Sequence, residues 1–168
     1  MKQAAIDISF LIHPIILFVT FSLAACEDFN FSQTYEGKVI KVLDGDSINI
    51  IQQGEEIRIR LAEIDAPEHG QAFWKISKQA LEEYVAGKRV SVEEFDRDKY
   101  GRVVGHVYIN DTWVNGALVK EGYAYVYSRY AVSKKLYKFE AQAEKNNLGV
   151  WKLPVKERVK PWDWRKQN

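Results

Sequence analysis

Cysteine and histidine are scarce in this sequence, and their scarcity excludes several kinds of site. The chain of 168 residues has one cysteine, Cys26, so it cannot form an intrachain disulfide. It has 3 histidines, and His69 has no histidine or cysteine partner at the spacing of zinc ligands. We interpret His69 as a loop residue and His106, which lies in an expected strand, as structural. A metal site would therefore rely on oxygen ligands.

An excess of positive charge is also missing. The chain has 24 lysine and arginine residues against 23 aspartate and glutamate residues, which gives a formal net charge of +1. This balance excludes a histone-like protein, so any contact with nucleic acid must come from local arginines and lysines. There is no internal repeat or low-complexity tract, and the composition is that of one ordinary globular domain.

Residues 1–25 have the order of charged, apolar and small residues that is typical of a secretory signal. The ending Leu23-Ala-Ala-Cys26 resembles a bacterial lipoprotein signal, in which the cysteine is lipidated and becomes the new N-terminus. We therefore expect export from a bacterial cytoplasm, with Cys26 as the lipidation site and a membrane as partner through that lipid. The alternatives are a secreted or periplasmic protein with a cleaved signal, and a retained anchor, since the apolar run is about as long as a minimal membrane span.

Apolar periodicity and turn residues divide the remaining chain into a linker (26–34), a domain (35–153) and an aromatic, basic tail (154–168). Alternation of apolar and polar residues predicts strands at 35–43, 47–53, 56–64, 89–95 and 103–109. In the third of these, Arg58, Arg60 and Ala62 are expected on the face away from the aliphatic core. Helical spacing followed by glycine predicts helices at 73–85, 114–121 and 132–143. Five short antiparallel strands with three helices indicate an α+β fold, an OB-type five-stranded barrel.

Acids and arginines gather in four short clusters. They are Asp44-Gly-Asp46-Ser47, Arg60 before Asp65, Asp65-Ala66-Pro67-Glu68, and Asp98-Lys99-Tyr100-Gly-Arg102. Each alone has an ordinary interpretation, such as a turn, a surface ion pair or a hairpin tip. Together they supply carboxylates for a hard cation, calcium or magnesium, and guanidinium groups for an anionic phosphodiester. We expect Asp46 and Asp65 to hold one such ion.

Phosphodiester hydrolysis also needs a positioned water and positive charge near the non-bridging oxygens. Glu68, on the rigid loop after Pro67, is the candidate that orients or deprotonates the water. Two arginines could neutralise the developing charge with fork-shaped hydrogen bonds, and an arginine in that role can contribute about 10³–10⁵ in rate.

These clusters, with the motifs that follow them, resemble the successive signatures of the staphylococcal nuclease (thermonuclease) family. In chain order the motifs are Asp44-Gly-Asp-Ser, Arg60-x4-Asp65-Ala-Pro-Glu68, Asp98-Lys-Tyr-Gly-Arg102, Val114-Asn115…Leu118-Val119…Gly122, Gly149-x-Trp151 and Pro161-x-x-Trp164-Arg165. The resemblance extends over residues 35–165, and it implies a five-stranded OB barrel with three helices.

The resemblance also implies a metal site. Asp46 and Asp65 would bind calcium, with the backbone carbonyl of Ala66 beside them. Ser47 stands where threonine is commoner in the family, and Ala66 replaces a threonine of its best-known member. We expect neither change to remove the site, because serine keeps the hydroxyl and the ligand at position 66 is the main-chain oxygen.

The implied substrate contacts lie on three segments. Arg60 and Arg102 would hold the phosphate, and Glu68 would be the general base or the group that positions the water. Lys99 and Tyr100 would contact a flanking phosphate.

Three tyrosines between the second and the third predicted helix have two interpretations. Tyr125, Tyr127 and Tyr130 either stack on bases or pack at the barrel mouth, and we take Tyr130 as the substrate contact. The other aromatic candidates are interpreted as packing or tail anchors; they are Trp113, Trp151, Trp162 and Trp164.

The sequence thus predicts a monomeric, calcium-dependent nuclease that hydrolyses DNA, RNA or both, preferably where strands are single or frayed. The resemblance implies products with a 3′-phosphate. Two alternatives remain at this point. One is a non-catalytic OB-fold module that binds nucleic acid, and the other is a surface lipoprotein whose acids hold a stabilising ion.

Overall fold

The computed structural model describes residues 33–167 of the chain. The expected signal segment, the lipidation site Cys26 and most of the expected linker lie outside the described residues. Within the described part of the chain, no helix combines the length and the apolar character that a membrane span requires.

Five strands form a barrel, and they are β1 (Thr34–Val42), β2 (Ser47–Gln52), β3 (Glu55–Leu61), β5 (Arg89–Arg97) and β6 (Val103–Ile109). Neighbours in the order β3-β2-β1-β5-β6 pair antiparallel, as expected. The barrel closes through a parallel pairing of β3 with β6, in which Ile59, Arg60 and Leu61 lie opposite Val103, Val104 and Gly105. The sheet is therefore mixed, and the expected α+β barrel is confirmed with this difference in strand direction.

Alternating β-branched residues line the barrel interior. Ile48, Ile50, Ile59, Val92 and Val107 are all fully buried. Burying each such side chain stabilises the fold by about 1.5–3 kcal/mol. Their alternation also fixes the register, because a shift by one residue would expose the apolar set.

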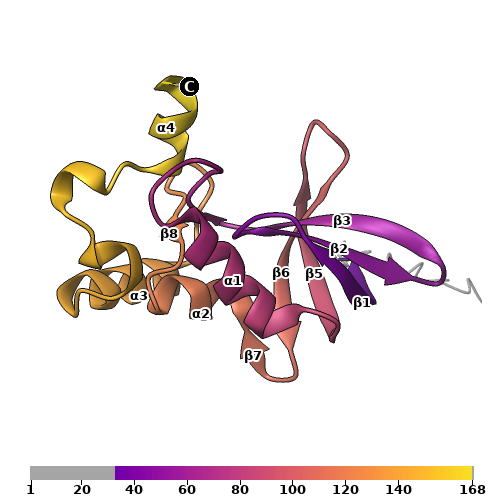
Figure 1. The fold of residues 1–168 in the computed structure, drawn as a ribbon. Coiled ribbons are helices and arrows are strands. Elements are labelled where there is room, and N and C mark those ends of the chain that lie inside the picture. Colours follow the sequence, from indigo (N-terminus) through magenta and orange to yellow (C-terminus); the bar gives the residue numbers. More distant parts are fainter. Residues whose placement is uncertain (1–32, 168) are drawn as a thin grey trace, which may run out of the picture. The chain divides into compact units, whose positions relative to one another are not determined.

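Three helices pack beside the barrel, and they are α1 (Trp74–Val85), α2 (Val114–Lys120) and α3 (Lys134–Lys145). Figure 1 shows all three on one side of the barrel strands, while the tip of the β5–β6 hairpin projects away from them. Helix α1 begins one residue later than expected, because Phe73 has a left-handed conformation with φ 74°. Val132, expected in the third helix, precedes α3 and is 73% exposed.

The tail forms more regular structure than the sequence predicts. After α3 come two 3₁₀ turns, η1 (Gly149–Lys152) and η2 (Val155–Glu157), and then a fourth helix, α4 (Pro161–Gln167). Proline at the first position suits a helix start, because its missing N–H has no intrahelical acceptor there. Three two-residue strands were also not expected, and they are β4 (Ile64–Asp65), β7 (Thr112–Trp113) and β8 (Tyr125–Val126).

Asn115 joins the barrel closure to helix α2. It is fully buried, its Oδ1 accepts from Val107 N at 2.9 Å, and its Nδ2 donates to Ala62 O at 3.0 Å. Ala62 itself is fully buried, so the expectation that it lies on the outer face is wrong. The Asn115 side chain lies against this backbone, and the polar groups of all three residues are satisfied without water.

Two glycines allow a direct contact between backbone segments on the helical side. Gly122, in the turn after α2, and Gly149, at the start of η1, have φ of 77° and 52°. Val150 N donates to Gly122 O at 2.8 Å. A Cβ on Gly149 would collide with the Gly122 carbonyl, and one on Gly122 would collide with the Leu148 carbonyl.

Candidate active site

Asp46 lies in the turn between β1 and β2. The turn is fixed by Asp44, whose Oδ1 accepts from Asp46 N at 3.0 Å, and by Leu61 N, which donates to Asp46 O at 2.8 Å. The Asp46 side chain points inward, where Ala66 N donates to its Oδ2 at 2.6 Å and Ser47 Oγ donates to its Oδ1 at 3.2 Å. The turn and the loop after β4 thus meet at one carboxylate.

Gly45 lets this turn approach the loop closely. A Cβ at this position would lie 2.7 Å from Ala66 Cβ and 2.9 Å from Ser77 Cβ of helix α1. Real Cβ contacts are longer than this, so only glycine fits without displacing a neighbour.

Asp65 is the last residue of β4, and β4 pairs with β8 so that Asp65 lies opposite Tyr125. The residue is fully buried. Glu63, directly before β4, has φ 64°, and this left-handed residue separates the end of β3 from β4. The chain turns there, so Asp65 returns toward the end of the strand that carries Arg60.

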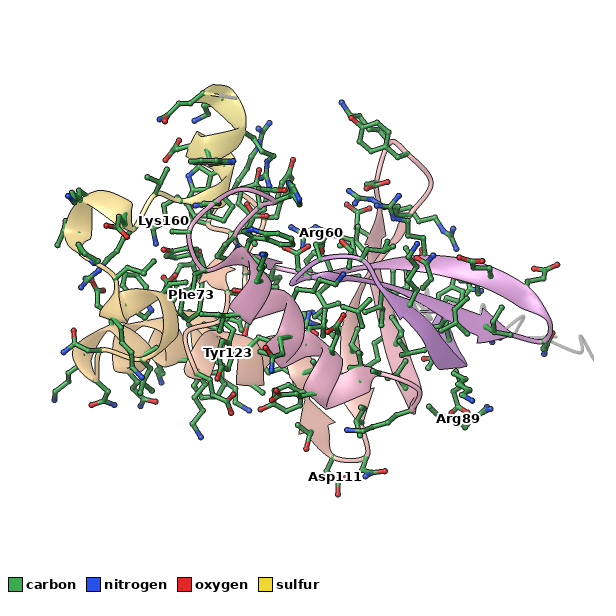
Figure 2. All side chains as sticks on the ribbon, viewed as in Figure 1. Arg60, Phe73, Arg89, Asp111, Tyr123 and Lys160 are labelled. Carbon is green, nitrogen blue, oxygen red and sulfur yellow. The ribbon has the colours of Figure 1, made fainter. Side chains whose placement is uncertain are left out.

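Arg60 brings the two buried acids together. Its Nη1 lies 3.1 Å from Asp46 Oδ1, and its Nη2 lies 2.7 Å from Asp65 Oδ1. The Arg60 side chain is only 15% exposed. Acids that are 19 positions apart in the sequence therefore face one guanidinium. Figure 2 shows the Arg60 side chain in the region between helix α4 and the β5–β6 hairpin.

The negative charge of this site is incompletely balanced. Burial raises the pKa of Asp46 well above its ordinary value, and the neighbouring Asp44 and Asp65 carboxylates add to the rise. Arg60 and the hydrogen bond from Ala66 oppose the rise without cancelling it. The site therefore favours an additional positive charge near Asp46.

Glu68 follows on the same loop and is partly exposed. Its backbone N–H donates to the side-chain oxygen of Gln71 at 3.0 Å, and Gln71 N donates back to Glu68 O at 2.9 Å. The Glu68 carboxylate accepts a bond from Arg165 Nη1. The reciprocal bonds between Glu68 and Gln71 fix the loop backbone, so a rigid turn sets the direction of the Glu68 carboxylate.

Arg165, in helix α4, completes the cluster. Its Nη1 and Nη2 donate to the two oxygens of Asp65 at 3.1 and 2.8 Å, and Nη1 also donates to Glu68. Burial lowers the pKa of Arg165, but its bonds to Asp65 and Glu68 raise it by more, so the guanidinium stays charged. The structure thus assembles Asp46, Asp65, Glu68, Arg60 and Arg165 from four segments of the chain.

Arg102 lies at the base of the β5–β6 hairpin, directly before β6. It is two residues before Val104, which pairs with Arg60, so its position is on the sheet face that carries Arg60. Its Nε donates to Asp98 Oδ2 at 2.6 Å. Burial raises the pKa of Asp98, but bonds from Arg102 and from Tyr100 N outweigh this effect and bring the pKa below its ordinary value.

The remaining predicted substrate contacts lie on exposed surface. Lys99 and Tyr100 form the hairpin tip, with Tyr100 73% exposed and the Lys99 ammonium 5.0 Å from its ring centre. Tyr130 is 54% exposed, and its ring meets that of Tyr127 edge-on at 5.0 Å. Tyr125 is buried against Trp151, which fits packing and excludes base stacking for that residue.

The donor set fits a hard divalent cation. Asp46 and Asp65 present carboxylate oxygens to the two terminal nitrogens of one guanidinium, and Asp46 also contacts the Ala66 backbone. Oxygen-only donors suit calcium or magnesium. Among residues 33–167 no three acidic, imidazole or thiolate side chains converge on one point, so backbone oxygens and waters would have to supply the remaining ligands.

Gln71 and Arg165 are the two residues of the site that the sequence analysis did not identify. Gln71 has no motif that marks it. Arg165 belongs to the quoted motif Pro161-x-x-Trp164-Arg165, but the tail was interpreted only as aromatic and basic. A contact between positions 65 and 165 has no signature in local periodicity.

A comparison with protein families matches residues 58–153 to the model described as staphylococcal nuclease homologue. The matched range contains Arg60, Asp65, Glu68 and Arg102. Asp46 precedes it and Arg165 follows it.

Comparison with curated proteins finds nucleases of bacteria and plants. A protein described as an uncharacterized endonuclease of Escherichia coli is 37% identical over 153 residues, which are 90% of this chain and 95% of that protein. The micrococcal nuclease of Shigella flexneri is 36% identical over 145 residues, 80% of this chain and 82% of that protein. A probable staphylococcal-like nuclease of Oryza sativa subsp. japonica is 39% identical over 121 residues, 69% of this chain and 36% of that protein.

Proposed function

The chain belongs to the staphylococcal nuclease family and is a nuclease, a phosphodiester hydrolase, and we propose that it cleaves DNA or RNA strands in a calcium-dependent reaction. The observation that carries the proposal is the meeting of Asp46 and Asp65 on the Arg60 guanidinium, with Glu68 in the same cluster. Single-stranded or frayed stretches are the proposed substrate, and 3′-phosphate ends the proposed product.

Asp46, Asp65 and the main-chain oxygen of Ala66 would hold the cation. Members of the family typically depend on calcium. A bound calcium would supply positive charge to a non-bridging phosphate oxygen and so favour attack on phosphorus. The burial of Asp46 and Asp65 supports this assignment, because a cation beside the two buried carboxylates would offset the cost of removing their charges from water.

Glu68 is proposed to orient the attacking water and accept its proton. It is the most exposed of the three acids, with a side chain that is 34% exposed against 8% for Asp46 and 0% for Asp65. Water and substrate can therefore reach Glu68, while the other two acids face the interior. This difference supports a division into two metal-binding carboxylates and one acid–base carboxylate.

Arg60 and Arg102 are proposed to bind the phosphate from the sheet face that they share. Arg102 bonds Asp98 through Nε, and its two terminal nitrogens would be the donors to a phosphate. Lys99 and Tyr100 at the hairpin tip would contact the next phosphate. Tyr130 would offer its ring to a base, and such stacking contributes about 1–3 kcal/mol per base.

Hydrolysis of denatured DNA, followed with calcium and then with excess chelator, tests the proposal. We expect calcium-dependent cleavage that Glu68→Gln lowers by about 10²–10⁴-fold, the usual contribution of a general base. Glu82→Gln, on the exposed face of α1, is the matched control and should cleave at the wild-type rate. Calorimetric calcium binding should persist in Glu68→Gln, since this carboxylate is not among the proposed ligands.

Two other results would favour the alternatives. Binding of denatured DNA without cleavage would indicate a binding module. A calcium-dependent rise in melting temperature with neither binding nor cleavage would indicate a structural ion.

We also propose export and lipidation at Cys26, which rest on the sequence of residues 1–26 alone. Mass spectrometry of the mature N-terminus in a bacterial host checks this. A diacylglyceryl mass on Cys26 is the expected result, and an unmodified thiol would exclude the lipid anchor.

A further inference from the structure

Helix α4 brings a guanidinium into the candidate active site from outside the range matched to the family. Arg165 donates to both oxygens of Asp65 at 3.1 and 2.8 Å and to Glu68. The family match ends at residue 153, so it gives Arg165 no role. Asp65 is thus bonded by two arginines, Arg60 from the barrel and Arg165 from the tail.

Helix α4 is held in place by contacts that do not involve Arg165. The Trp162 ring stacks on Tyr127 at 5.3 Å with an angle of 11° between the planes. The Lys160 ammonium lies 4.1 Å from the centre of the Tyr125 ring, and the Gln71 amide donates to Val159 O. Because these contacts fix the backbone, a substitution at position 165 should change the guanidinium and leave the helix docked.

The two arginines differ in their access to solvent. Arg60 is 15% exposed, whereas Arg165 is 40% exposed and bonds an acid that is fully buried. Arg165 therefore has room on its solvent side, from which a nucleic-acid strand would approach, and Arg60 has little.

A cation and Arg165 compete for the same oxygens. Asp65 Oδ1 already accepts from Arg60 at 2.7 Å and from Arg165 at 3.1 Å, and its Oδ2 accepts from Arg165. A divalent ion bound to Asp65 would take a lone pair from this carboxylate and repel the guanidinium beside it. Arg165 would then need another anion, and a phosphodiester is the anion that the active site receives.

The net charge of the cluster also favours binding of a phosphodiester after the cation. Among the groups that pair directly with Arg60 and Arg165, the three carboxylates of Asp46, Asp65 and Glu68, when ionised, outnumber the two guanidinium groups by one negative charge. A divalent cation turns this into one net positive charge, which attracts a phosphodiester. Without Arg165 the loaded cluster would be neutral.

We propose that Arg165 is a third substrate-binding arginine of the nuclease site, which bonds Asp65 and Glu68 in the absence of the cation and turns to the phosphodiester when the cation binds. This inference rests on the proposed function. It assigns the tail, through helix α4, a part in both metal binding and substrate binding.

The first test is calcium binding by isothermal titration calorimetry without substrate. Arg165→Gln removes the competing guanidinium, so we expect calcium to bind about tenfold more tightly, within the usual range of coupling between two ligands. Lys166→Gln removes the same charge from the same helix, but the Lys166 side chain is 72% exposed and bonds Asp163 of that helix, whose side chain is also exposed. Its calcium affinity should match the wild type.

The second test is kinetic, at saturating calcium and with single-stranded oligonucleotide. Losing a hydrogen-bonded charge on the phosphate should lower kcat/KM of Arg165→Gln by about 10–100-fold, mainly through KM. Arg165→Lys keeps the charge and should recover part of the loss. Near-ultraviolet circular dichroism, which reports the Trp162–Tyr127 stack, should be unchanged in both variants.

Unchanged or weaker calcium binding in Arg165→Gln, or equal tightening in Lys166→Gln, would overturn the inference. Tighter calcium binding with unchanged kcat/KM would also overturn it, since Arg165 would then only block the metal site. If the wild type bound calcium but cut no nucleic acid, the proposed function would fail, and the calorimetric result would still decide whether Arg165 competes with the ion.

Discussion

At the scale of single residues, the two buried acids of the site share one arginine. Arg60 reaches Asp46 and Asp65 with different nitrogens, at 3.1 and 2.7 Å. The planar guanidinium can do this because its donors diverge, whereas a lysine ammonium is a single point charge. Removing one partner of a buried ion pair typically costs about 3–5 kcal/mol, because the other charge stays buried.

Arg60→Lys should therefore keep the charge of the site and lose its geometry. We expect kcat/KM to fall by about 10³-fold or more, the lower range for an arginine that stabilises phosphoryl transfer. Arg58→Lys, on the exposed face of the same strand, should cleave like the wild type. Steady-state cleavage of denatured DNA measures both variants, and a loss of less than tenfold in Arg60→Lys would contradict the proposed role.

Gly45→Ala tests the contact between the β1–β2 turn and the loop that carries Asp65. The added methyl group would lie 2.7 Å from Ala66 Cβ, so the turn must move away. We expect a loss of about 1–3 kcal/mol in the free energy of unfolding, which is typical of overpacking, measured in urea. Calcium affinity should also fall, because Asp46 moves with the turn. A stable variant with unchanged calcium binding would show that the turn adjusts without moving Asp46.

The acid and arginine clusters were predictable from residue types, because hard cations need oxygen and phosphates need guanidinium. The structure brings Asp46, Arg60, Asp65 and Glu68 into one cluster, and their chemical roles stay predictions. Arg165 could not be assigned in this way. Its partner is 100 positions away, and a lone arginine in a basic tail has many possible partners.

At the scale of elements, strand β6 contains a partly buried histidine between two polar neighbours. Trp113 Nε1 donates to His106 Nδ1 at 3.2 Å, and His106 Nε2 lies 3.5 Å from Glu63 Oε2. The bond from Trp113 needs a neutral acceptor at Nδ1. Burial lowers the pKa of His106 below its ordinary value of 6.5, although the Glu63 and Glu93 carboxylates oppose the decrease.

This lowered pKa predicts a loss of stability in mild acid. Below pH 6.5 the unfolded chain binds a proton at His106 more readily than the folded chain does. Protonation therefore stabilises the unfolded state relative to the folded state. The stabilisation is present above pH 6.5 and is lost as pH falls toward the folded-state pKa, by at most about 1.4 kcal/mol per pH unit. His106→Asn should flatten this part of the pH profile in urea unfolding experiments.

His69→Asn is the matched control, because His69 is exposed. It should leave the slope between pH 7 and pH 5 unchanged, within the precision of about ±10–15% that extrapolation from urea allows. Equal slopes in the wild type and in His106→Asn would contradict the assignment of this loss of stability to His106.

Element positions were predictable where apolar residues alternate over a whole strand or follow helical spacing. The strands around Val39, Ile50, Ile59, Val92 and Val107 are of this kind. The two-residue pair β4–β8 was not predictable, because its stability comes from partners 60 and 62 positions apart and not from local pattern. The parallel closure of β3 on β6 was missed for the same reason, since strand direction depends on tertiary packing.

At the scale of the whole molecule, the contact between Gly122 and Gly149 connects the barrel and α2 to the segment that leads to helix α4. Both glycines have positive φ, and their backbones meet with no side chain between them. The bond from Val150 N to Gly122 O, at 2.8 Å, closes this contact. The placement of η1, and of the tail that follows it, thus depends on the absence of a Cβ at both glycines.

Gly149→Ala should be strongly destabilising. Its Cβ would collide with the backbone of Gly122 and lie 2.8 Å from Glu121 O, and its φ is unfavourable for alanine. Backbone strain and overpacking contribute about 1–3 kcal/mol each, so we expect a total near the upper end of that range or above it. Urea unfolding measures the loss.

Gly54→Ala separates the two causes. Gly54 has φ +89°, but a Cβ there would meet no atom within 4 Å. This variant therefore reports the backbone conformation alone and should lose less stability than Gly149→Ala. Equal losses in the two variants would mean that the collision with Gly122 adds nothing.

The closure of β3 on β6 affects how readily strands of another copy of the protein can add to the sheet. A sheet that closes on itself leaves few unpaired N–H and C=O groups to which a strand of another molecule could add. The first half of β3 lies outside the paired stretch, and it carries the charged and exposed residues Glu55, Glu56 and Arg58. Charge on that part of β3 discourages strand addition there.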